Sequence, residues 1–199
     1  ATRAKAAAAG QTGILRIGLN YSAPINPKLS AIFRRFIKLY PHVGLELHEN
    51  TSAKQLDGLY HRTLDVCFVW PTRDDASPDI AVHPLGKDEL QMVVAREHPL
   101  ARKQRLSASD LKDQIIYLTL RQTRMDFYDA LMSACRASGF APDIRTDLIQ
   151  LPFIMNVAAA KQGIAFIPDF FHRIRPEGTV FRPVTFLPIT ARLMPLSIA

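Results

Sequence analysis

Apolar and polar residues alternate in short blocks over the first third of the chain, and their spacing changes from block to block. The run 14–19 is short and apolar, which indicates a buried strand. Asn26 and Pro27 then mark a helix start, because Asn can cap a helix and Pro suits its first position. Six apolar residues follow at the spacing of one helix face: Leu29, Ile32, Phe33, Phe36, Ile37 and Tyr40. Pro41 disfavours helical geometry in the residue before it, so we expect the helix to stop there.

The next blocks continue a regular order of strand and helix. Residues 45–48 are expected to form a strand, 52–62 a helix and 64–69 a third strand. The order β–α–β–α–β predicts a parallel sheet with right-handed crossovers. Ligands of open α/β sheets bind at the carboxyl ends of the strands. The loop 20–25, which follows the first strand, is therefore expected at a binding edge.

The remaining two thirds of the chain repeat this order in kind, although no repeat is visible in the sequence itself. Further strands are expected at 80–83, 89–95, 115–118, 143–148, 164–167, 179–183 and 192–198, and helices at 125–138 and 151–160. Ser107 and Asp110 have the spacing of a capping box, and Gly139 is placed to end the first of these helices. The pattern predicts two similar α/β lobes with a cleft between them.

Hydroxyl residues stand at two of the expected strand-to-helix transitions, namely Ser22 and the pair Thr51–Ser52. They can act simply as helix caps, and Ser52 with Gln55 has the spacing of a capping box. They can also mark helix N-termini that present free N–H groups and a positive dipole end to an anion. The two interpretations are compatible, because a cap residue can face a ligand.

Composition narrows the class of protein. Of the 199 residues, 48% are hydrophobic and 22% charged, which is ordinary for a globular protein of one or two domains. No apolar run approaches the ~20 residues of a membrane helix, and no membrane partner is expected. The net charge of +7 is dispersed, without a zinc-finger or helix-turn-helix pattern, so this segment is not expected to bind DNA directly. Cys67 and Cys135 make no disulfide framework, which indicates a reducing cytoplasm.

No arrangement of side chains points to catalysis. The chain lacks a Gly-x-Ser-x-Gly elbow, a phosphate loop and a dinucleotide fingerprint. The six histidines are spread along the chain and no two of them stand at helical spacing, so no metal site is expected. Cys67 lies among apolar residues and is expected to be a small core residue. We therefore expect neither an enzyme nor a cofactor.

Six short motifs occur in order at fitting distances: 13–18, 36–41, 64–66, 84–85, 98–101 and 163–168. Together they resemble the effector-binding domain of LysR-type transcriptional regulators. The resemblance implies an α/β fold of two Rossmann-like lobes joined by two crossover strands, similar to type 2 periplasmic binding proteins. It divides the chain into a linker remnant (1–12), lobe I (13–86 and 184–199) and lobe II (87–183). It also implies a winged helix-turn-helix DNA-binding domain that is absent from this chain.

One departure from the family pattern concerns the turn before Gly163. The family's usual glycine is replaced by Lys161. A Cβ is unfavourable in the left-handed geometry that often ends a helix, so this turn is expected to have a different shape.

Carried over residue by residue, the resemblance assigns effector binding to eight residues. They are Ser22, Thr51 and Ser52 from lobe I, and Arg121, Thr123, Arg124, Phe127 and Gln150 from lobe II. Hydrogen-bond donors and cations dominate this set, which suits a small carboxylate or sulfonate, and Phe127 could contact a ring.

The resemblance also implies a homodimer or homotetramer, in which the helix 28–40 packs antiparallel against 125–138, or the residues next to it, of a partner. DNA would be reached only through the absent domain. Two alternatives stay open on the sequence alone: a solute-binding protein of a transport system, and an enzyme of similar topology.

Overall fold

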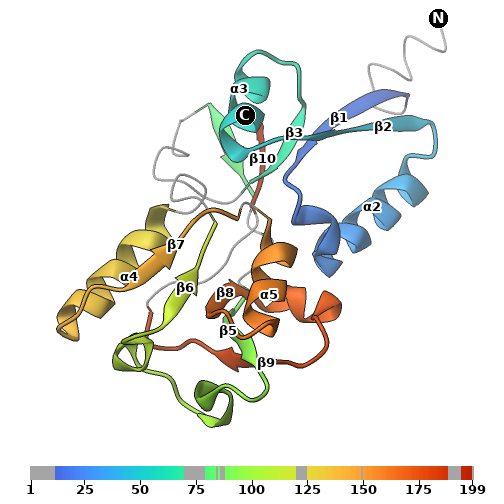
Figure 1. Cartoon of the computed structure of the whole chain (residues 1–199). Helices are drawn as coiled ribbons and strands as arrows, with labels where there is room; N and C mark the ends of the chain where they lie inside the picture. The colour runs from blue at the N-terminus through green and yellow to red at the C-terminus, as the bar shows by residue number, and fades with distance from the viewer. Residues whose placement is uncertain are drawn as a thin grey trace, which may run out of the picture. The chain divides into compact units, whose positions relative to one another are not determined.

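The computed structural model describes residues 12–69, 79–83, 85, 88–119, 125–148, 150–187 and 194–198. The chain divides into unit 1, Ala1–Gly86 with Leu193–Ala199, and unit 2, Lys87–Arg192. The last strand, red in Figure 1, therefore returns to the unit that the blue N-terminal strand begins. The expected linker remnant lies almost wholly outside the described residues.

Unit 1 is built on a five-stranded sheet. Its strands are β1 (Gly13–Leu19), β2 (Val43–Glu49), β3 (Val66–Val69), β4 (Ile80–Val82) and β10 (Met194–Ile198), in the order β2-β1-β3-β10-β4. β1 pairs in parallel with both β2 and β3, which confirms the predicted β–α–β–α–β run. β10 is antiparallel to both of its neighbours, β3 and β4.

Two helices connect the parallel strands of unit 1. Helix α2 (Pro27–Leu39) follows a 3-10 turn, η1 (Ala23–Ile25), and α3 (Ser52–Tyr60) links β2 to β3. The Asn26 side chain accepts a hydrogen bond from the Lys28 amide at 2.9 Å, which confirms Asn26 as the cap of α2. Phe33 of α2 contacts Phe68 of β3 edge-to-face, with ring centroids 6.1 Å apart.

Unit 2 contains a second five-stranded sheet. Its strands are β5 (Leu90–Ala95), β6 (Ile115–Tyr117), β7 (Asp143–Arg145), β8 (Ile164–Pro168) and β9 (Thr179–Pro183), in the order β7-β6-β8-β5-β9. Its helices are α4 (Met125–Ala137) and α5 (Leu151–Ala159), with 3-10 turns η2 (Pro99–Arg102), η3 (Ala108–Leu111) and η5 (Asp169–Ile174). β6 is parallel to β7 and β8, whereas β5 is antiparallel to β8 and β9.

The two sheets share one topology. In each sheet the first parallel strand, β1 or β6, lies between the other two parallel strands. An antiparallel strand, β10 or β5, follows next to β3 or β8, and a further strand, β4 or β9, forms the edge. This agreement confirms the prediction of two similar α/β lobes, which the sequence signalled only through the order of its elements.

The segment after β9 stays with unit 2. Val184 and Leu187 belong to the core cluster of that unit, and the Val184 amide donates to the Leu90 carbonyl at 2.9 Å. The described residues that directly follow β9 therefore pack with unit 2, whereas the bounds expected for the two lobes stay a prediction.

The helix ends of unit 2 follow one pattern. Gly139 has φ +84°, which confirms it as the residue that ends α4. Lys161 also adopts left-handed geometry, with φ +61°. Its amide donates to Ala158 and the next amide donates to Val157, so the turn is a Schellman motif of ordinary shape. The expectation of a different turn was wrong, because the surrounding hydrogen bonds hold Lys161 in place despite its Cβ.

Candidate functional site

The carboxyl edge of the unit 1 sheet brings two loops together. Leu19 ends β1 and lies opposite Glu49, which ends the parallel strand β2. The Asn50 amide donates to the Leu19 carbonyl at 2.8 Å. The loop that leads to α2 and the loop that leads to α3 therefore begin side by side, as the parallel topology predicted.

Ser22 is buried in the first of these loops, with 1% of its surface exposed. Its amide and its hydroxyl approach Asn20 Oδ1 at 3.1 and 2.6 Å. Because Oδ1 can only accept, the Ser22 hydroxyl must direct its proton to Asn20. Ser22 precedes η1 but makes no side-chain cap bond. Its interpretation as a helix cap was therefore wrong: the hydroxyl holds the loop through Asn20.

The N-terminus of α2 has no free amide to offer. Pro27 lacks an N–H, and Asn26 Oδ1 accepts from Lys28. The Leu29 and Ser30 amides both donate to the Asn26 carbonyl, at 3.2 and 3.4 Å. The expected free N–H groups at this helix start were wrong, because Asn26 takes up all of them. What this end of α2 retains is the positive end of the helix dipole.

Helix α3 starts differently. Thr51 is its cap and accepts from the Lys54 amide at 3.4 Å, whereas Ser52 is already the first helical residue. The predicted capping box of Ser52 with Gln55 was therefore wrong by one position, and the Gln55 side chain donates instead to the Asn50 carbonyl at 2.9 Å. Within the described part of the chain, the amides of Ser52 and Ala53 have no hydrogen-bond partner. Free N–H groups at a helix start suit an anion.

Of the five effector-binding residues expected in unit 2, the structure describes two, Phe127 and Gln150. Gln150 is exposed and begins α5 as expected, without a side-chain cap bond. Phe127 is only 6% exposed and packs in the core of unit 2, with its ring centroid 5.7 Å from that of Phe166. Its contact with an effector stays a prediction. Arg121, Thr123 and Arg124 lie outside the described residues.

Sequence reasoning did not predict that three amide side chains of these loops and of α3 are buried. Asn20, Asn26 and Gln55 are at most 5% exposed. Asn20 Nδ2, Asn26 Nδ2 and Gln55 Oε1 are buried without a hydrogen-bond partner in the described structure. An Asn directly after an apolar strand and an Asn before Pro were visible signals. Their burial was not, because it depends on how the loop folds back on the sheet.

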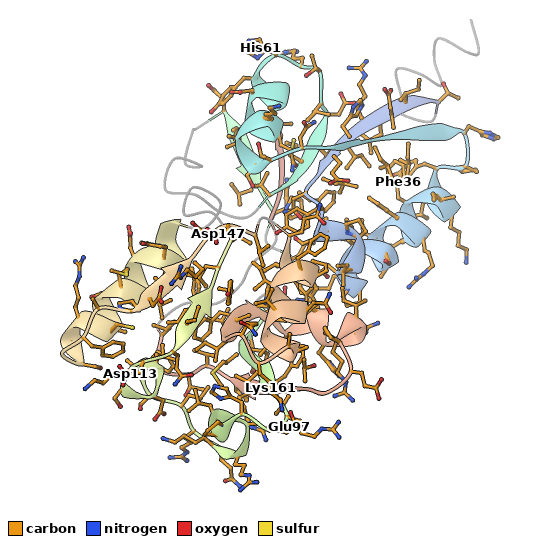
Figure 2. The ribbon with its side chains drawn as sticks, viewed as in Figure 1. Phe36, His61, Glu97, Asp113, Asp147 and Lys161 are labelled. Atoms are coloured by element: carbon orange, nitrogen blue, oxygen red, sulfur yellow. The ribbon has the colours of Figure 1, made fainter. Side chains whose placement is uncertain are left out.

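A shallow polar groove runs along α3. Its lining consists of Asn50, Lys54, Asp57, Gly58, His61 and Thr63, and its volume is about 370 Å³. Figure 2 shows His61 at the far end of α3. The groove is open and combines donors, acceptors and both signs of charge, so its lining has no feature that selects a ligand.

The described residues show neither a reactive thiol at Cys67 nor a metal-binding cluster. Burial raises the pKa of the Cys67 thiol to about 12, against a smaller opposing effect of a hydrogen bond from the Gly18 backbone. A thiol with so high a pKa is not a nucleophile at neutral pH. Among the described residues, no three His, Cys, Asp or Glu side chains gather into a metal-binding group. None of the described helices combines the length and the apolar character needed to cross a bilayer.

Comparison with known proteins supplies the family. The family model described as the LysR substrate binding domain matches residues 8–194. The transcriptional regulator TtuA of Agrobacterium vitis is 27% identical over 190 residues, covering 95% of this chain and 62% of that protein. The regulator AlsR of Bacillus subtilis is 23% identical over 188 residues, covering 94% and 61%. The chain thus spans about three fifths of the length of these relatives.

A solved structure agrees on the fold. The effector-binding domain of BenM with its effector benzoate superimposes with a TM-score of 0.80 at 21% identity, covering 94% of this chain and 83% of that one. The relatives named here are transcriptional regulators. With two α/β sheets of the type 2 periplasmic-binding-protein kind and a family match over most of its length, the chain belongs to the LysR substrate binding domain family.

Proposed function

We propose that this chain is the effector-sensing and dimerisation domain of a LysR-type transcriptional regulator that works in the bacterial cytoplasm. A small carboxylate or sulfonate is its effector, and a DNA-binding domain outside this chain reads the target sequence. The observation that carries the effector class is the start of α3, where the amides of Ser52 and Ala53 have no partner in the described structure. Both amides lie at the positive end of this nine-residue helix.

The neighbouring structures support this choice. BenM, whose effector-binding domain has the same fold, is described with benzoate, an aromatic carboxylate. In this chain the Ser52 hydroxyl and the adjacent amides would hold the carboxylate oxygens. Arg121, Thr123, Arg124, Phe127 and Gln150 would contribute from unit 2. Binding then stabilises one arrangement of the two units over others, which is the differential interaction that a switch requires.

Helix α2 supports self-association. Ile32 and Ile37 of α2 and its C-cap residue Tyr40 are 36%, 54% and 41% exposed, although they belong to the apolar face of this helix. The helix carries four cations and no acid, Lys28, Arg34, Arg35 and Lys38. An apolar face of this size on a monomer is typical of a protein interface. We propose that α2 packs antiparallel against α4 of a second copy.

A binding experiment tests the effector class. A thermal-shift screen should compare small acids with their neutral analogues, for example benzoate with benzamide. We expect the hits to be acids, and we expect Ser52→Ala to weaken the best hit about ten- to a hundredfold, because its oxygens lose a donor. Ser133→Ala, on the exposed face of α4, is the matched control and should bind as the parent chain does. Hits that are neutral or cationic, or a Ser52→Ala variant that binds equally well, would contradict the proposal.

A further inference from the structure

Gln55 is a polar side chain on the buried face of α3. The buried residues of this helix are Gln55, Gly58 and Leu59, and Gln55 is 0% exposed. A position of this kind usually holds an apolar residue, because a polar group loses its water there. The amide at Gln55 therefore requires an explanation.

The orientation of this amide is fixed by its neighbour. Gln55 Nε2 lies 2.9 Å from the Asn50 carbonyl oxygen, which can only accept, so this branch of the side chain must be the nitrogen. Oε1 occupies the other branch, where it is buried and has no hydrogen-bond partner among the described residues. It also lies so close to β1 that a Cβ on Gly18 would be 2.9 Å away from it.

The amide consequently adds little to the free energy of unfolding. One hydrogen bond is gained at Nε2, and a buried acceptor is left unpaired at Oε1. The penalty for such an unpaired group is as large as the net gain from one hydrogen bond, or larger. Apolar contacts hold α3 on the sheet without it, because Leu59 packs in one cluster with Leu64 and Cys67. An apolar residue at position 55 would serve the fold at least as well.

What the amide does fix is the segment that leads into α3. The Asn50 amide donates to the Leu19 carbonyl at the end of β1, and the Asn50 carbonyl accepts from the Gln55 side chain. The peptide groups on both sides of Asn50 are therefore held. The backbone amide of Gln55 also donates to the Thr51 carbonyl at 3.0 Å. Gln55 thus binds both residues that precede the helix.

A further bond joins Gln55 to β3. The Cys67 thiol donates to the Gln55 carbonyl, with Sγ 3.2 Å from the oxygen. Cys67 is paired with Gly18 of β1, and the Gln55 side chain lies against both of them. The start of α3 is therefore fixed relative to two parallel strands, and with it the direction of the unpaired Ser52 and Ala53 amides.

We propose that Gln55 is a positioning residue for the effector site. It does not contact the effector: its Nε2 holds the Asn50 carbonyl, and this bond orients the Ser52 and Ala53 amides before an anion arrives. The unpaired Oε1 is the energetic penalty of that arrangement. The inference deepens the proposed function and rests on it.

Gln55→Met tests the inference, because Met has a similar shape and no strong hydrogen-bonding group. We expect its midpoint of unfolding in urea to equal or exceed that of the parent chain. We expect its affinity for benzoate, or for the acid of the panel that binds best, to fall about tenfold, because the two amides must then be ordered on binding. A purely structural residue would instead lower the midpoint.

The matched control is Leu59→Met. It places the same residue at a second fully buried position of α3, one turn further along, and leaves the bonds to Asn50 and Thr51 in place. We expect a slightly lower midpoint of unfolding, since a packed Leu is replaced, and an unchanged affinity. The two variants together separate the packing of α3 from the orientation of its first residues.

Nuclear magnetic resonance relaxation gives a second readout. In ¹⁵N-labelled chains without ligand, the order parameters of the Ser52 and Ala53 amides should be lower in Gln55→Met than in the parent chain. Those of Gly58 and Leu59 should stay near about 0.85, the value of rigid backbone. Saturation with benzoate should raise the order parameters of Ser52 and Ala53 again.

The outcomes separate the two proposals. If no acid of the panel binds, the proposed function and this inference fail together. If an acid binds in a Ser52-dependent way and Gln55→Met binds it as tightly as the parent chain does, the inference alone is wrong. A Gln55→Met variant that is less stable than the parent chain or does not fold, or one with unchanged order parameters at Ser52 and Ala53, would also overturn the inference.

Discussion

Gly139 and Lys161 occupy the same position at the ends of two helices, and only one of them is glycine. Each is the left-handed residue of a Schellman motif, with φ +84° at the end of α4 and +61° at the end of α5. The hydrogen bonds correspond: Gly139 to Arg136 and Phe140 to Cys135 in one, Lys161 to Ala158 and Gln162 to Val157 in the other. The second helix therefore carries backbone strain that the first avoids.

Replacing Lys161 by Gly should stabilise the domain. The change removes the steric cost of a Cβ at positive φ, and the greater freedom of the unfolded chain offsets part of the gain, which leaves about 0.5–1 kcal/mol. Lys161 Nζ lies 3.5 Å from Glu97 Oε2, and both side chains are exposed, as Figure 2 shows. Lys161→Ala removes this ion pair but keeps the Cβ, so it separates the two effects. The reverse change, Gly139→Lys, should lower the free energy of unfolding in urea, and a gain there would contradict the strain argument.

Gly163 should tolerate no side chain at all. Its φ is +150°, and a Cβ would lie 2.4 Å from the Ile115 carbonyl oxygen, a backbone atom of the adjacent strand β6. Neither strand can move without breaking the sheet, so Gly163→Ala should cost about 3 kcal/mol or more, in the range of severe core changes. Gly139→Ala is the matched control, because nothing lies within 4 Å of its added Cβ. We expect a loss of only about 1 kcal/mol there. Equal losses for the two variants, measured by urea unfolding, would show that the close approach is unimportant.

Asp110 should make the free energy of unfolding of unit 2 decrease at low pH. Burial acts to raise the pKa of this carboxyl, but hydrogen bonds from the Lys103 side chain and from Ser107 outweigh it and hold the pKa below 3.8, its ordinary value. The folded state thus binds the proton less readily than the unfolded state. The stabilisation is complete above pH 3.8 and is lost as the pH falls through the lowered pKa.

Unfolding measured across that range should show the effect. Asp110→Asn should flatten the loss of stability below pH 3.8, since the variant has no carboxylate to protonate. Lys103→Gln removes one of the interactions that lower the pKa of Asp110. It should therefore reduce the dependence of the free energy of unfolding on pH without abolishing it. If Asp110→Asn follows the same pH profile as the parent chain, the network does not stabilise the fold.

The exposed face of α2 should control assembly. Ile37 is 54% exposed in the isolated chain, and Ile37→Asp would place a charge in the proposed contact with α4 of the partner. We expect the parent chain to be a dimer at tens of micromolar, as an interface of standard size predicts, and the variant to be a monomer. Tyr60→Asp, on α3 and 51% exposed, is the control and should leave the dimer intact. Light scattering that finds the parent chain monomeric at this concentration would refute the α2 interface.

The sequence by itself determined the order of the elements that begin the first sheet and their parallel pairing. Apolar spacing marked β1, α2, β2, α3 and β3 in order, and parallel pairing follows because a helix crosses over between successive strands. The cap of α2 could be assigned from Asn26 and Pro27 alone, because capping is a local hydrogen bond. The set of motifs between Gly13 and Pro168 also led to the right family, since their order is specific even where each is weak.

Only the tertiary structure decided what the polar residues of the site do. Ser22 and Ser52 each stand beside a helix start, yet one is bound to Asn20 and the other follows the true cap, Thr51. The roles differ because they depend on which neighbouring group the folded loop brings within about 3 Å, and a hydrogen bond is lost when that geometry shifts by a single residue. The same reason hid Asn20 and Asn26 from sequence reasoning. Their unpaired nitrogens exist only because the loop turns back and excludes water, and burial of this kind is a property of the whole fold.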